Sequence, residues 1–375
     1  MSVKVAIDIS PLKSSHAVRG VGSYTKNLVE ALEQEGKRPA CRRGRVKEQE
    51  LKIDFIDFRD QQYNNLAIKQ FDIVHYPFFD LFFLTLPLKK ITKTIVTIHD
   101  VIPLVFPEHY PPGIKGKLKF QVQKFSLQGT SAVITDSENS KKDIVKYLSY
   151  PEEKIHVVYL APGKEFKKLS REAGSCSAGE IRRKYNLPEK FVLYVGDVNW
   201  NKNIQGLIRA FAQLQQTTDN IGYSIGLVLV GKAFKDEGLE ETKEILQLIK
   251  KLGLEERILR LGWVSEEDLV KIYNLAIVYC QPSFYEGFGL PVLEAMACGC
   301  PTVVAKTSSL PEICEEAAIM VNPENIDDIA KGLDKVIGDQ KICDTIIKKG
   351  LDQAKKFSWE KTAKETINVY RKVAS

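Results

Sequence analysis

Short apolar runs, each followed by a polar or glycine-containing loop and then by an amphipathic segment, recur along this 375-residue chain. Continuous apolar runs of strand length predict strands buried on both faces, and strands that alternate with helices predict a parallel sheet. Because the chain is too long for one ordinary core, the sequence predicts an α/β fold of two doubly wound, Rossmann-like parallel-sheet domains. The predicted strands lie within residues 3–9, 51–58, 71–76, 94–98, 132–135, 155–159, 191–195, 227–230, 258–264, 275–280 and 301–305.

The alternation is interrupted once, near the middle of the chain. Residues 161–180 are rich in Gly, Ser and Lys and lack periodicity, which predicts a linker and the approach to a helix. We therefore expect an N-terminal domain of residues 1–165 and a C-terminal domain of residues 166–356. Residues 36–50 are polar and basic, and they predict an exposed connection without an assignable role.

The stretch 282–294, Pro-Ser-Phe-Tyr-Glu-Gly-Phe-Gly-Leu-Pro-Val-Leu-Glu, joins a predicted strand to a predicted helix. Pro291 is expected at the first helical position, and Gly299 is expected to end the helix. Backbone N–H groups at such a helix start, beyond the carboxyl end of a parallel strand, form a site for a phosphate group. These amides belong to Gly287, Phe288, Gly289 and Leu290.

Two carboxylates frame this loop, Glu286 and Glu294, the second expected in the first helical turn. Because a carboxylate repels phosphate, each is expected to accept hydrogen bonds from hydroxyl groups, one set on a sugar and one on a ribose. That combination describes a nucleotide-sugar. For either residue alone, a solvated Glu or a helix-start Glu remains an alternative. A glycosidase-like pair, with Glu286 as nucleophile and Glu294 as acid, is disfavoured because one lies on a phosphate-type loop and the other in a helix.

The motif Pro-Ser-x-x-Glu-Gly-Phe-Gly-Leu-Pro-x-Leu-Glu-Ala-Met-Ala-Cys-Gly resembles that of the retaining glycosyltransferases of family 4, which have the GT-B fold. The resemblance covers nearly the whole chain. It implies that the two domains face a deep cleft, with the acceptor on the N-terminal side and the nucleotide-sugar on the C-terminal side. It also implies that a last helix, within residues 357–375, completes the first domain.

His99 and Asp100 follow the predicted strand 94–98. The sequence that comes after them is similar to that of the family's bacterial polysaccharide mannosyltransferases. The resemblance implies that His99 contacts the donor sugar or its β-phosphate and that Asp100 lies near the acceptor. Lys202 matches the family's lysine for the donor diphosphate, whereas Asp197 stands where many relatives carry Arg, so the second cation is not identified. The expected catalytic residues are Glu286, His99 and Lys202. The expected donor-binding residues are Gly22, Gly196, Lys202, Trp263, Val264, Glu286, Gly287, Phe288, Gly289, Leu290 and Glu294.

The resemblance implies a retaining transferase that moves a hexose, with mannose from GDP-mannose as the expected donor and a lipid-linked oligosaccharide or polysaccharide as acceptor. No Asp-x-Asp motif occurs in the sequence, so we expect no metal and no other cofactor. The alternatives are a family member that uses a UDP- or ADP-hexose and a soluble acceptor, and a non-catalytic nucleotide-binding module. A dehydrogenase is disfavoured because Thr25 occupies the third position of the dinucleotide-binding glycine motif.

The positive charge is concentrated in the first 165 residues, which hold 25 Lys and Arg against 19 Asp and Glu, while the remainder is balanced. This excess suits anionic lipid or an anionic acceptor, and an ordinary solvated surface explains it equally well. Segment 114–125 predicts a basic amphipathic helix, the strongest local candidate for a membrane contact beside a plain solvated face. Its lysines are Lys115, Lys117, Lys119 and Lys124. No recognition motif accompanies the charge, so no nucleic-acid partner is expected.

Apolar content and cysteine usage bear on location. No run of about 18 apolar residues predicts a transmembrane helix, and the first residues predict a strand and not a signal peptide. Seven scattered cysteines are typical of reduced thiols. We expect a cytoplasmic protein, with the inner face of the cytoplasmic membrane as a further location. The apolar segment 78–86 predicts a core helix, with a membrane-touching patch as the alternative.

Overall fold

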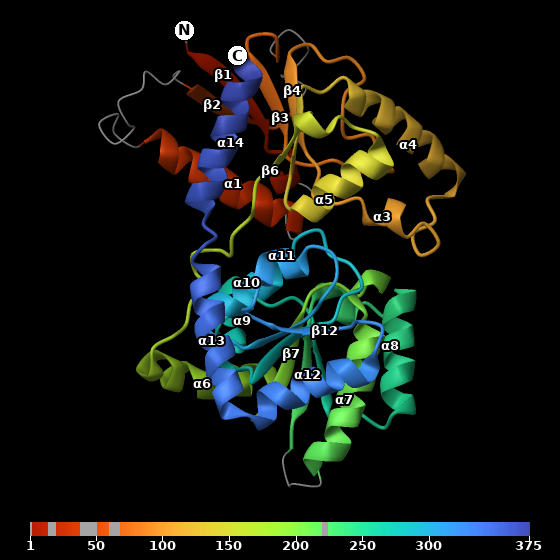
Figure 1. Cartoon of the computed structure of the whole chain (residues 1–375), viewed down its shortest axis with the longest axis vertical. Helices are drawn as coiled ribbons and strands as arrows, with labels where there is room; N and C mark the ends of the chain where they lie inside the picture. Colours follow the sequence, from red (N-terminus) through yellow and green to blue (C-terminus); the bar gives the residue numbers. More distant parts are fainter. Residues whose placement is uncertain (1, 14–19, 38–50, 60–67, 220–223) are drawn as a thin grey trace. The chain divides into compact units, whose positions relative to one another are not determined.

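The computed structural model describes residues 2–13, 20–37, 51–59, 68–219 and 224–375, without the side chains of 171–177 and 216–219. The chain divides into two compact units, each with its own sheet (Figure 1). Unit 1 is Met1–Leu160 with Phe357–Ser375, and unit 2 is Ala161–Lys356. The division thus falls after Leu160, against a predicted boundary at residue 165. Most of the predicted connection 36–50 lies outside the described residues.

Unit 1 is built on a six-stranded sheet with the order β2-β1-β3-β4-β5-β6, in which every pairing is parallel. Its strands are β1 (Val3–Asp8), β2 (Leu51–Ile56), β3 (Ile73–Tyr76), β4 (Lys93–Thr97), β5 (Ala132–Thr135) and β6 (Ile155–Val157). Its helices are α1 (Gly20–Gly36), α3 (Ile102–Val105), α4 (Gly113–Gln128), α5 (Glu138–Asp143) and α14 (Trp359–Ala374). Shorter turns are η1 (Ser10–Lys13), the π-helical η4 (Ile144–Leu148) and η5 (Glu152–Lys154).

The last helix, α14, belongs to unit 1 and lies beside α1 (Figure 1). Its Tyr370 hydroxyl is 2.8 Å from Nδ1 of His75, whose Nε2 is 2.8 Å from Oγ1 of Thr97. All three side chains are buried, and burial lowers the pKa of His75 to about 3. A neutral imidazole with both nitrogens bonded therefore joins the end of the chain to strands β3 and β4.

Residues 78–86 form a loop, so the predicted helix there is wrong. The side chain of Asp80 accepts hydrogen bonds from the backbone N–H groups of Phe82 (2.7 Å) and Phe83 (2.9 Å). Such a turn competes with helical hydrogen bonding. Phe79 and Leu86 still lie in the core, whereas Phe83 is exposed.

Unit 2 is built on a second six-stranded parallel sheet, with the order β12-β11-β10-β7-β8-β9. Its strands are β7 (Phe191–Val195), β8 (Gly226–Val230), β9 (Ile258–Leu261), β10 (Val278–Gln281), β11 (Thr302–Ala305) and β12 (Ile319–Val321). Its helices are α6 (Arg171–Tyr185), α7 (Ile204–Asp219), α8 (Glu240–Lys251), α9 (Glu266–Leu275), α10 (Leu290–Ala297), α11 (Leu310–Cys314), α12 (Ile326–Gly338) and α13 (Gln340–Ala354). The 3₁₀ turns are η6 (Trp200–Lys202) and η7 (Lys232–Lys235). The prediction of two doubly wound parallel sheets is confirmed.

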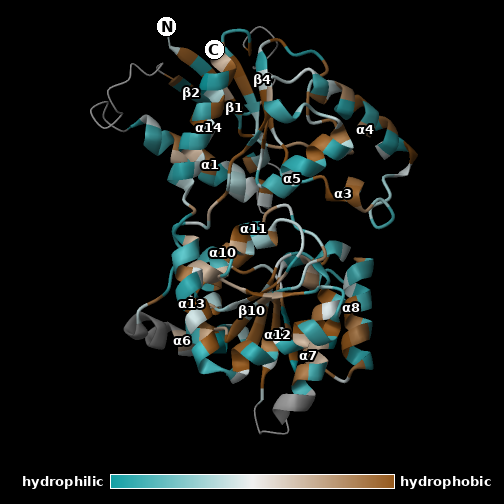
Figure 2. Ribbon diagram, in the orientation of Figure 1, coloured by the Kyte–Doolittle hydropathy of each residue, from teal (hydrophilic) through white to brown (hydrophobic). Residues whose placement is uncertain are grey.

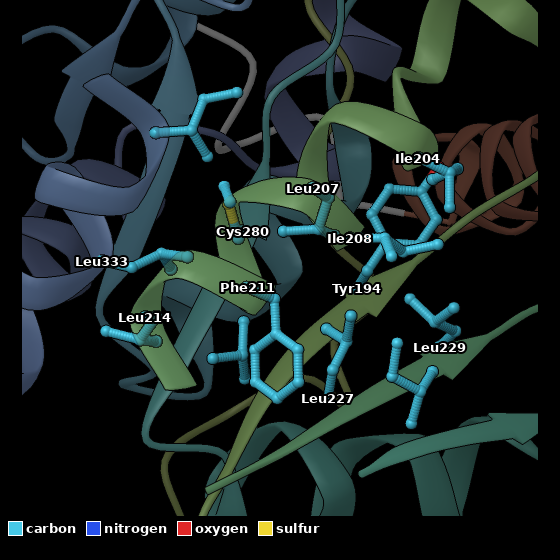
Figure 3. Close-up of a cluster of buried hydrophobic side chains, with 14 of the residues drawn as sticks. Tyr194, Ile204, Leu207, Ile208, Phe211, Leu214, Leu227, Leu229, Cys280 and Leu333 are labelled. Atoms are coloured by element: carbon cyan, nitrogen blue, oxygen red, sulfur yellow. The ribbon is translucent and has the colours of Figure 1, made fainter. Parts of the chain in front are cut away.

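Helix α7 shows how unit 2 forms its core. Its apolar residues recur three and four positions apart and face the sheet, where they pack against side chains of β7 and β8 (Figure 3). The contributing residues of α7 include Ile204, Leu207, Ile208, Phe211 and Leu214, and those of the strands include Tyr194, Leu227 and Leu229.

The order of this sheet places a topological switch between β7 and β10. The chain leaves β7 toward β8 and β9 on one side, then returns to add β10, β11 and β12 on the other. In open α/β sheets ligands bind outside the carboxyl ends of the strands at such a switch. The loops that follow these two strands, 196–203 and 282–289, are therefore the expected location of a site.

Gly231, directly after β8, supports the first of these loops. Its amide donates to the carbonyl of Leu261 at 3.2 Å, and the amide of Gly196 donates to the carbonyl of Val230 at 2.9 Å. A methyl group on Gly231 would overlap the backbone carbonyl of Gly196. The two glycines thus allow the ends of β7 and β8 to approach closely.

We expect Gly231→Ala to lower the free energy of unfolding by about 1–3 kcal/mol, the cost typical of overpacking against an unyielding backbone. Urea unfolding followed by circular dichroism measures this change. Gly338→Ala, at an open helical position of the same unit, should leave stability unchanged or raise it slightly. Equal stabilities for the two variants would contradict the proposed close approach.

Candidate active site

The loops after β7 and β10 are joined by backbone, amide and aromatic contacts. The carbonyl of Asn201 accepts from the amide of Phe284 at 2.8 Å, and Nδ2 of Asn201 donates to the carbonyl of Tyr285 at 2.8 Å. The rings of Trp200 and Phe284 stack with their centroids 4.9 Å apart. These contacts fix the two loops against each other.

Asn203 fixes the start of α7 to the same region. It adopts a left-handed backbone conformation (φ 54°), which Asn tolerates better than most residues. Its Nδ2 donates to the carbonyls of Pro282 (3.0 Å) and Pro323 (2.7 Å), while its Oδ1 accepts from the amide of Gly206 at 3.2 Å. One buried side chain therefore caps α7 and holds the loop after β10.

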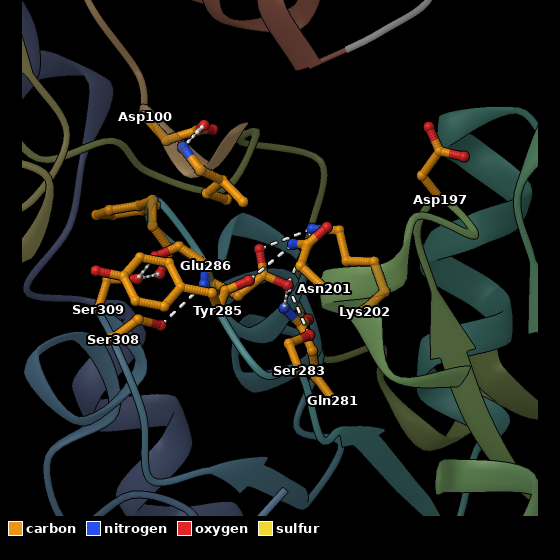
Figure 4. Close-up of polar contacts among 12 residues, drawn as sticks. Asp100, Asp197, Asn201, Lys202, Gln281, Ser283, Tyr285, Glu286, Ser308 and Ser309 are labelled. Carbon is orange, nitrogen blue, oxygen red and sulfur yellow. Dashed lines mark hydrogen bonds and ion pairs between the residues drawn. The ribbon is translucent and has the colours of Figure 1, made fainter. Parts of the chain in front are cut away.

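Glu286 is the centre of this arrangement (Figure 4). Its Oε1 accepts hydrogen bonds from Nζ of Lys202 (2.9 Å), Nε2 of Gln281 (2.8 Å) and Oγ of Ser283 (2.7 Å). Its Oε2 accepts a second hydrogen bond from Nζ of Lys202 at 2.7 Å. Glu286 is only 5% exposed, so an ion pair with additional donors offsets the cost of burying its charge.

A third loop, after β11, holds the backbone on either side of Glu286. Oγ of Ser308 accepts from the amide of Glu286 at 2.8 Å, and Oγ of Ser309 donates to the carbonyls of Glu286 (3.0 Å) and Phe288 (2.9 Å). Gly289 has φ 112°, and a Cβ there would lie 2.7 Å from Cδ2 of Leu310. The sequence Gly-Phe-Gly thus takes a conformation that requires glycine at its end.

The start of α10 follows this loop. Gly287, Phe288 and Gly289 are buried, whereas Leu290 and Pro291 keep partial exposure. Helix N-termini offer backbone N–H groups and a positive dipole end to anions. At the N-terminus of α10, solvent therefore reaches the first helical turn and not the three residues before it.

Glu294 lies in the second turn of α10, since the helix begins at Leu290, and not in the first turn as predicted. Pro291 is likewise the second helical residue, while Gly299 (φ 71°) follows the helix end as predicted. Oε2 of Glu294 accepts from the hydroxyl of Tyr273 at 3.1 Å. Burial of the carboxyl group raises the pKa of Glu294 to about 7, so that it titrates near neutral pH.

The remaining predicted residues of unit 2 follow β7, at the switch, and β9, at the edge of the sheet. Gly196 follows β7, and Trp263, 68% exposed, and the buried Val264 follow the edge strand β9. The carboxylate of Asp197 accepts from the amide of Val198 at 2.8 Å and lies apart from the Glu286 cluster (Figure 4). Because Asp197 is an acid, it cannot supply the positive charge of an arginine.

In unit 1 the predicted residues are His99, Asp100 and Gly22. Nδ1 of His99 lies 2.7 Å from Oδ2 of the buried Asp136, and the ring of Tyr24 packs edge-on at 4.7 Å between centroids. Burial acts to lower the pKa of His99, but the charge and hydrogen bond of Asp136, together with smaller contributions that include the charge of Asp100, hold that pKa above its ordinary value. Gly22 is buried in the first turn of α1, the helix that carries Tyr24.

Asp100 has a local structural role. Its Oδ1 accepts from the amide of Ile102 at 3.0 Å, at the start of α3. The structure thus brings Lys202 and Glu286 into direct contact within unit 2, and it places His99 beside Asp136 within unit 1.

Sequence reasoning missed the residues that position these groups. Gln281 is a polar residue at the end of an otherwise apolar strand, and Asp136 follows β5 just as Asp100 follows the strand next to it. Those two patterns were available signals. Ser283 belongs to the Pro-Ser-x-x-Glu motif, but the motif alone did not indicate that it bonds to Glu286. Ser308 and Ser309 lie in a loop, where serine is common.

The described residues contain neither a metal-binding cluster nor a membrane-spanning helix. No group of three or more His, Cys, Asp or Glu residues there is arranged to hold a metal ion. No helix in that part of the chain is both long enough and apolar enough to cross a membrane.

Comparisons with known proteins agree with this architecture. Residues 177–353 match the model of glycosyl transferases group 1, and residues 18–161 match that of glycosyltransferase family 4. The chain is similar to HepE of Anabaena, solved in complex with UDP-glucose, with a TM-score of 0.72, 18% identity and 99% of each chain covered. That likeness shows the fold.

Two relatives from Escherichia coli are similar in sequence. O-antigen chain mannosyltransferase B is 32% identical over 286 residues, which are 75% of this chain and 71% of the relative. Serotype-specific mannosyltransferase WbdA is 30% identical over 283 residues, which are 75% of this chain but only 34% of WbdA. The chain therefore spans about a third of the length of WbdA. These matches show that the chain belongs to glycosyltransferase family 4 and has the GT-B fold of two Rossmann-like domains.

Proposed function

We propose that this glycosyltransferase transfers mannose from GDP-mannose, with retention of configuration, to a lipid-linked oligosaccharide or polysaccharide acceptor. The observation that carries the proposal is the buried Glu286, held by Lys202, Gln281 and Ser283 at the switch between β7 and β10. A fixed carboxylate suits hydroxyl recognition, and a neighbouring lysine suits phosphate. The mannose assignment is supported by the two named mannosyltransferases among the relatives.

In the proposed reaction, Lys202 and the start of α10 hold the donor diphosphate while Glu286 orients the sugar. The acceptor hydroxyl attacks the anomeric carbon on the face from which the nucleoside diphosphate departs. The bond from that carbon to the β-phosphate oxygen breaks, the bond to the acceptor oxygen forms, and the departing phosphate takes the acceptor proton. Fixed cations and helix amides stabilise the negative charge that develops on the phosphate.

His99 and Glu294 are assigned to the two ends of the donor. The Asp136 carboxylate favours the imidazolium form of His99, which suits a contact with a sugar hydroxyl or the β-phosphate. Glu294 would accept hydrogen bonds from ribose hydroxyls when it is ionised. No metal is part of this proposal, because the sequence lacks an Asp-x-Asp motif.

A second candidate is a transferase of the same family that uses a UDP-hexose and a soluble sugar acceptor. The structural similarity to HepE, which was solved with UDP-glucose, is the observation that favours it. The two candidates differ in nucleobase, sugar and acceptor, and they share the Glu286 site.

The nucleobase is tested by the shift in melting temperature with GDP, UDP, ADP and dTDP at equal concentrations. Binding to the folded state stabilises it in proportion to the logarithm of ligand concentration over Kd, so we expect the largest shift with GDP. A larger shift with UDP would favour the second candidate. No shift with any nucleotide would contradict a nucleotide-sugar site.

Glu286→Gln should lower kcat/KM for mannose transfer by roughly a hundredfold or more, because the carboxylate that orients the sugar is lost. The variant keeps the side-chain volume and an oxygen for Gln281 and Ser283, so we expect it to fold. Transfer from radiolabelled GDP-mannose and a thermal melt measure the two properties. Glu256→Gln, at an exposed position of the same unit, is the control. A folded Glu286→Gln enzyme with near-normal turnover would refute the assigned role.

Glu294→Gln should have opposite effects on stability and donor binding. The pKa of Glu294 is about 7 in the folded protein against 4.5 ordinarily, so its ionisation destabilises the fold as pH rises between these values. We expect the variant to gain about 1–3 kcal/mol in free energy of unfolding at pH 8, with little gain below pH 4.5.

The same variant should bind GDP about tenfold more weakly at pH 8, since one acceptor of the ribose hydroxyls is lost. Urea unfolding at the two pH values and calorimetric titration with GDP measure these effects. A gain in stability that does not depend on pH would contradict the raised pKa. Unchanged GDP affinity would contradict the ribose contact.

A further inference from the structure

We propose that helix α4 and the loop that packs beside it form a surface that binds an anionic lipid bilayer. The surface comprises the apolar side chains of Phe83, Leu84, Leu88, Ile114, Leu118, Val122 and Phe125, with Lys115, Lys117, Lys119 and Lys124. We call it the α4 surface. The inference concerns unit 1 alone and does not depend on which donor the enzyme uses.

The first observation is where exposed hydrophobic residues occur. Among the described residues, nine large hydrophobic side chains are exposed, and seven of them belong to the α4 surface. Ile114 is 82% exposed and Phe125 73%, while Phe83 is 63% exposed. A concentration of this kind on one helix and one loop marks an interaction site, because exposed hydrophobic residues are otherwise scattered.

The second observation is the spacing on α4. Ile114, Leu118, Val122 and Phe125 recur at intervals of four, four and three residues, which places them in one stripe along the helix. Hydrophobic and hydrophilic residues are interleaved along α4 in Figure 2. The helix therefore presents an apolar stripe to solvent, the reverse of the usual arrangement for a surface helix.

The third observation is that polar contacts hold the opposite side of α4 to unit 1. Nε2 of the buried Gln123 donates to the carbonyl of Asp80 (3.0 Å) and to Oγ1 of Thr85 (2.7 Å). Oγ of the buried Ser126 donates to the carbonyl of Pro87 at 2.8 Å. These bonds to the loop fix the rotation of the helix, so its apolar stripe cannot turn inward without leaving buried polar groups unpaired.

The same loop supplies the other part of the surface. Phe82 packs against Phe120 of α4 with ring centroids 6.4 Å apart, and Nζ of Lys119 lies 4.8 Å from the ring centroid of Phe83. The exposed side chains of the loop are thus next to the helix, and they extend its apolar area.

The charge of these segments indicates what binds to the α4 surface. Residues 109–135 contain four lysines and no Asp or Glu, and residues 81–99 add the exposed Lys89 and no Asp or Glu. The other two lysines of residues 81–99, Lys90 and Lys93, donate to backbone carbonyls of unit 1. An apolar stripe flanked by lysines matches the boundary between acyl chains and anionic headgroups, where lysine side chains reach the phosphates. The outward stripe and the lysines beside it point to a helix that lies in the plane of the interface.

Vesicle flotation with the full chain tests the proposal. We expect the protein to float with vesicles of equal parts phosphatidylglycerol and phosphatidylcholine, and much less with phosphatidylcholine alone. Raising the salt concentration should weaken the anionic binding, because it screens the lysines. No binding to the anionic vesicles at low salt would overturn the proposal without needing any variant.

Two variants with several substitutions each separate the contribution of the apolar stripe to vesicle binding from that of the lysines. Ile114→Ser with Leu118→Ser and Phe125→Ser should lower the partition coefficient on anionic vesicles by roughly tenfold or more, because the area that enters the interface is lost. Lys115→Gln with Lys117→Gln should reduce the preference for anionic over neutral vesicles. Since these residues are exposed, the variants should melt at the wild-type temperature.

Matched controls lie on unit 2. Leu239→Ser changes an exposed hydrophobic residue outside the α4 surface, and Lys331→Gln with Lys335→Gln removes two exposed charges from α12. Both controls should bind vesicles as the wild type does. Equal losses in controls and α4 variants would overturn the assignment of this surface.

A protein partner is distinguished by the same variants. If the stripe instead covers a second copy of the chain, light scattering would show a dimer without lipid that the serine variant dissociates, and that result would overturn the bilayer proposal. Vesicle binding needs no nucleotide, so it succeeds or fails independently of the GDP titration and the transfer assay.

Discussion

The buried ion pair between Glu286 and Lys202 is the interaction on which the site of unit 2 depends. A carboxylate with 5% exposure is stable only when charge and hydrogen bonds replace water. Lys202 comes from the loop after β7, while Gln281 and Ser283 come from the end of β10 and its loop. The pair therefore requires these two strands to be neighbours, and the order of the sheet makes them so.

In both units the functional side chains lie at the carboxyl ends of the parallel strands, and a neighbouring side chain fixes each of them. In unit 1, Asp136 follows β5 and fixes the imidazole of His99, which follows β4. In unit 2 a lysine and two neutral side chains fix the carboxylate of Glu286. In each case a side chain that could face a ligand is held by an ionisable partner from an adjacent strand end, so little reorganisation is needed when a ligand arrives.

Helix α4 differs from helix α7 in the face that it buries. Helix α7 buries its apolar face on the sheet of unit 2, whereas α4 is attached to unit 1 through Gln123 and Ser126 and exposes its apolar stripe. A transferase that acts on lipid-linked sugars would meet its acceptor at a bilayer. The α4 surface and the proposed acceptor are therefore compatible, although they rest on separate observations.

Local sequence patterns determined eleven of the twelve described strands, the alternation with helices and the helix end at Gly299, because backbone preference and burial period act over a few residues. The short edge strand β12 was missed. The resemblance to the family singled out Glu286 and Lys202, and the structure shows that they touch. Only tertiary structure decided their partners, the second-turn position and raised pKa of Glu294, and the outward stripe of α4. The helix expected at 78–86 does not form, because Asp80 forms a local turn and the loop bonds to Gln123, which lies in α4. Hydrogen bonds between distant segments leave no periodic trace in the sequence, so composition and spacing could not specify them.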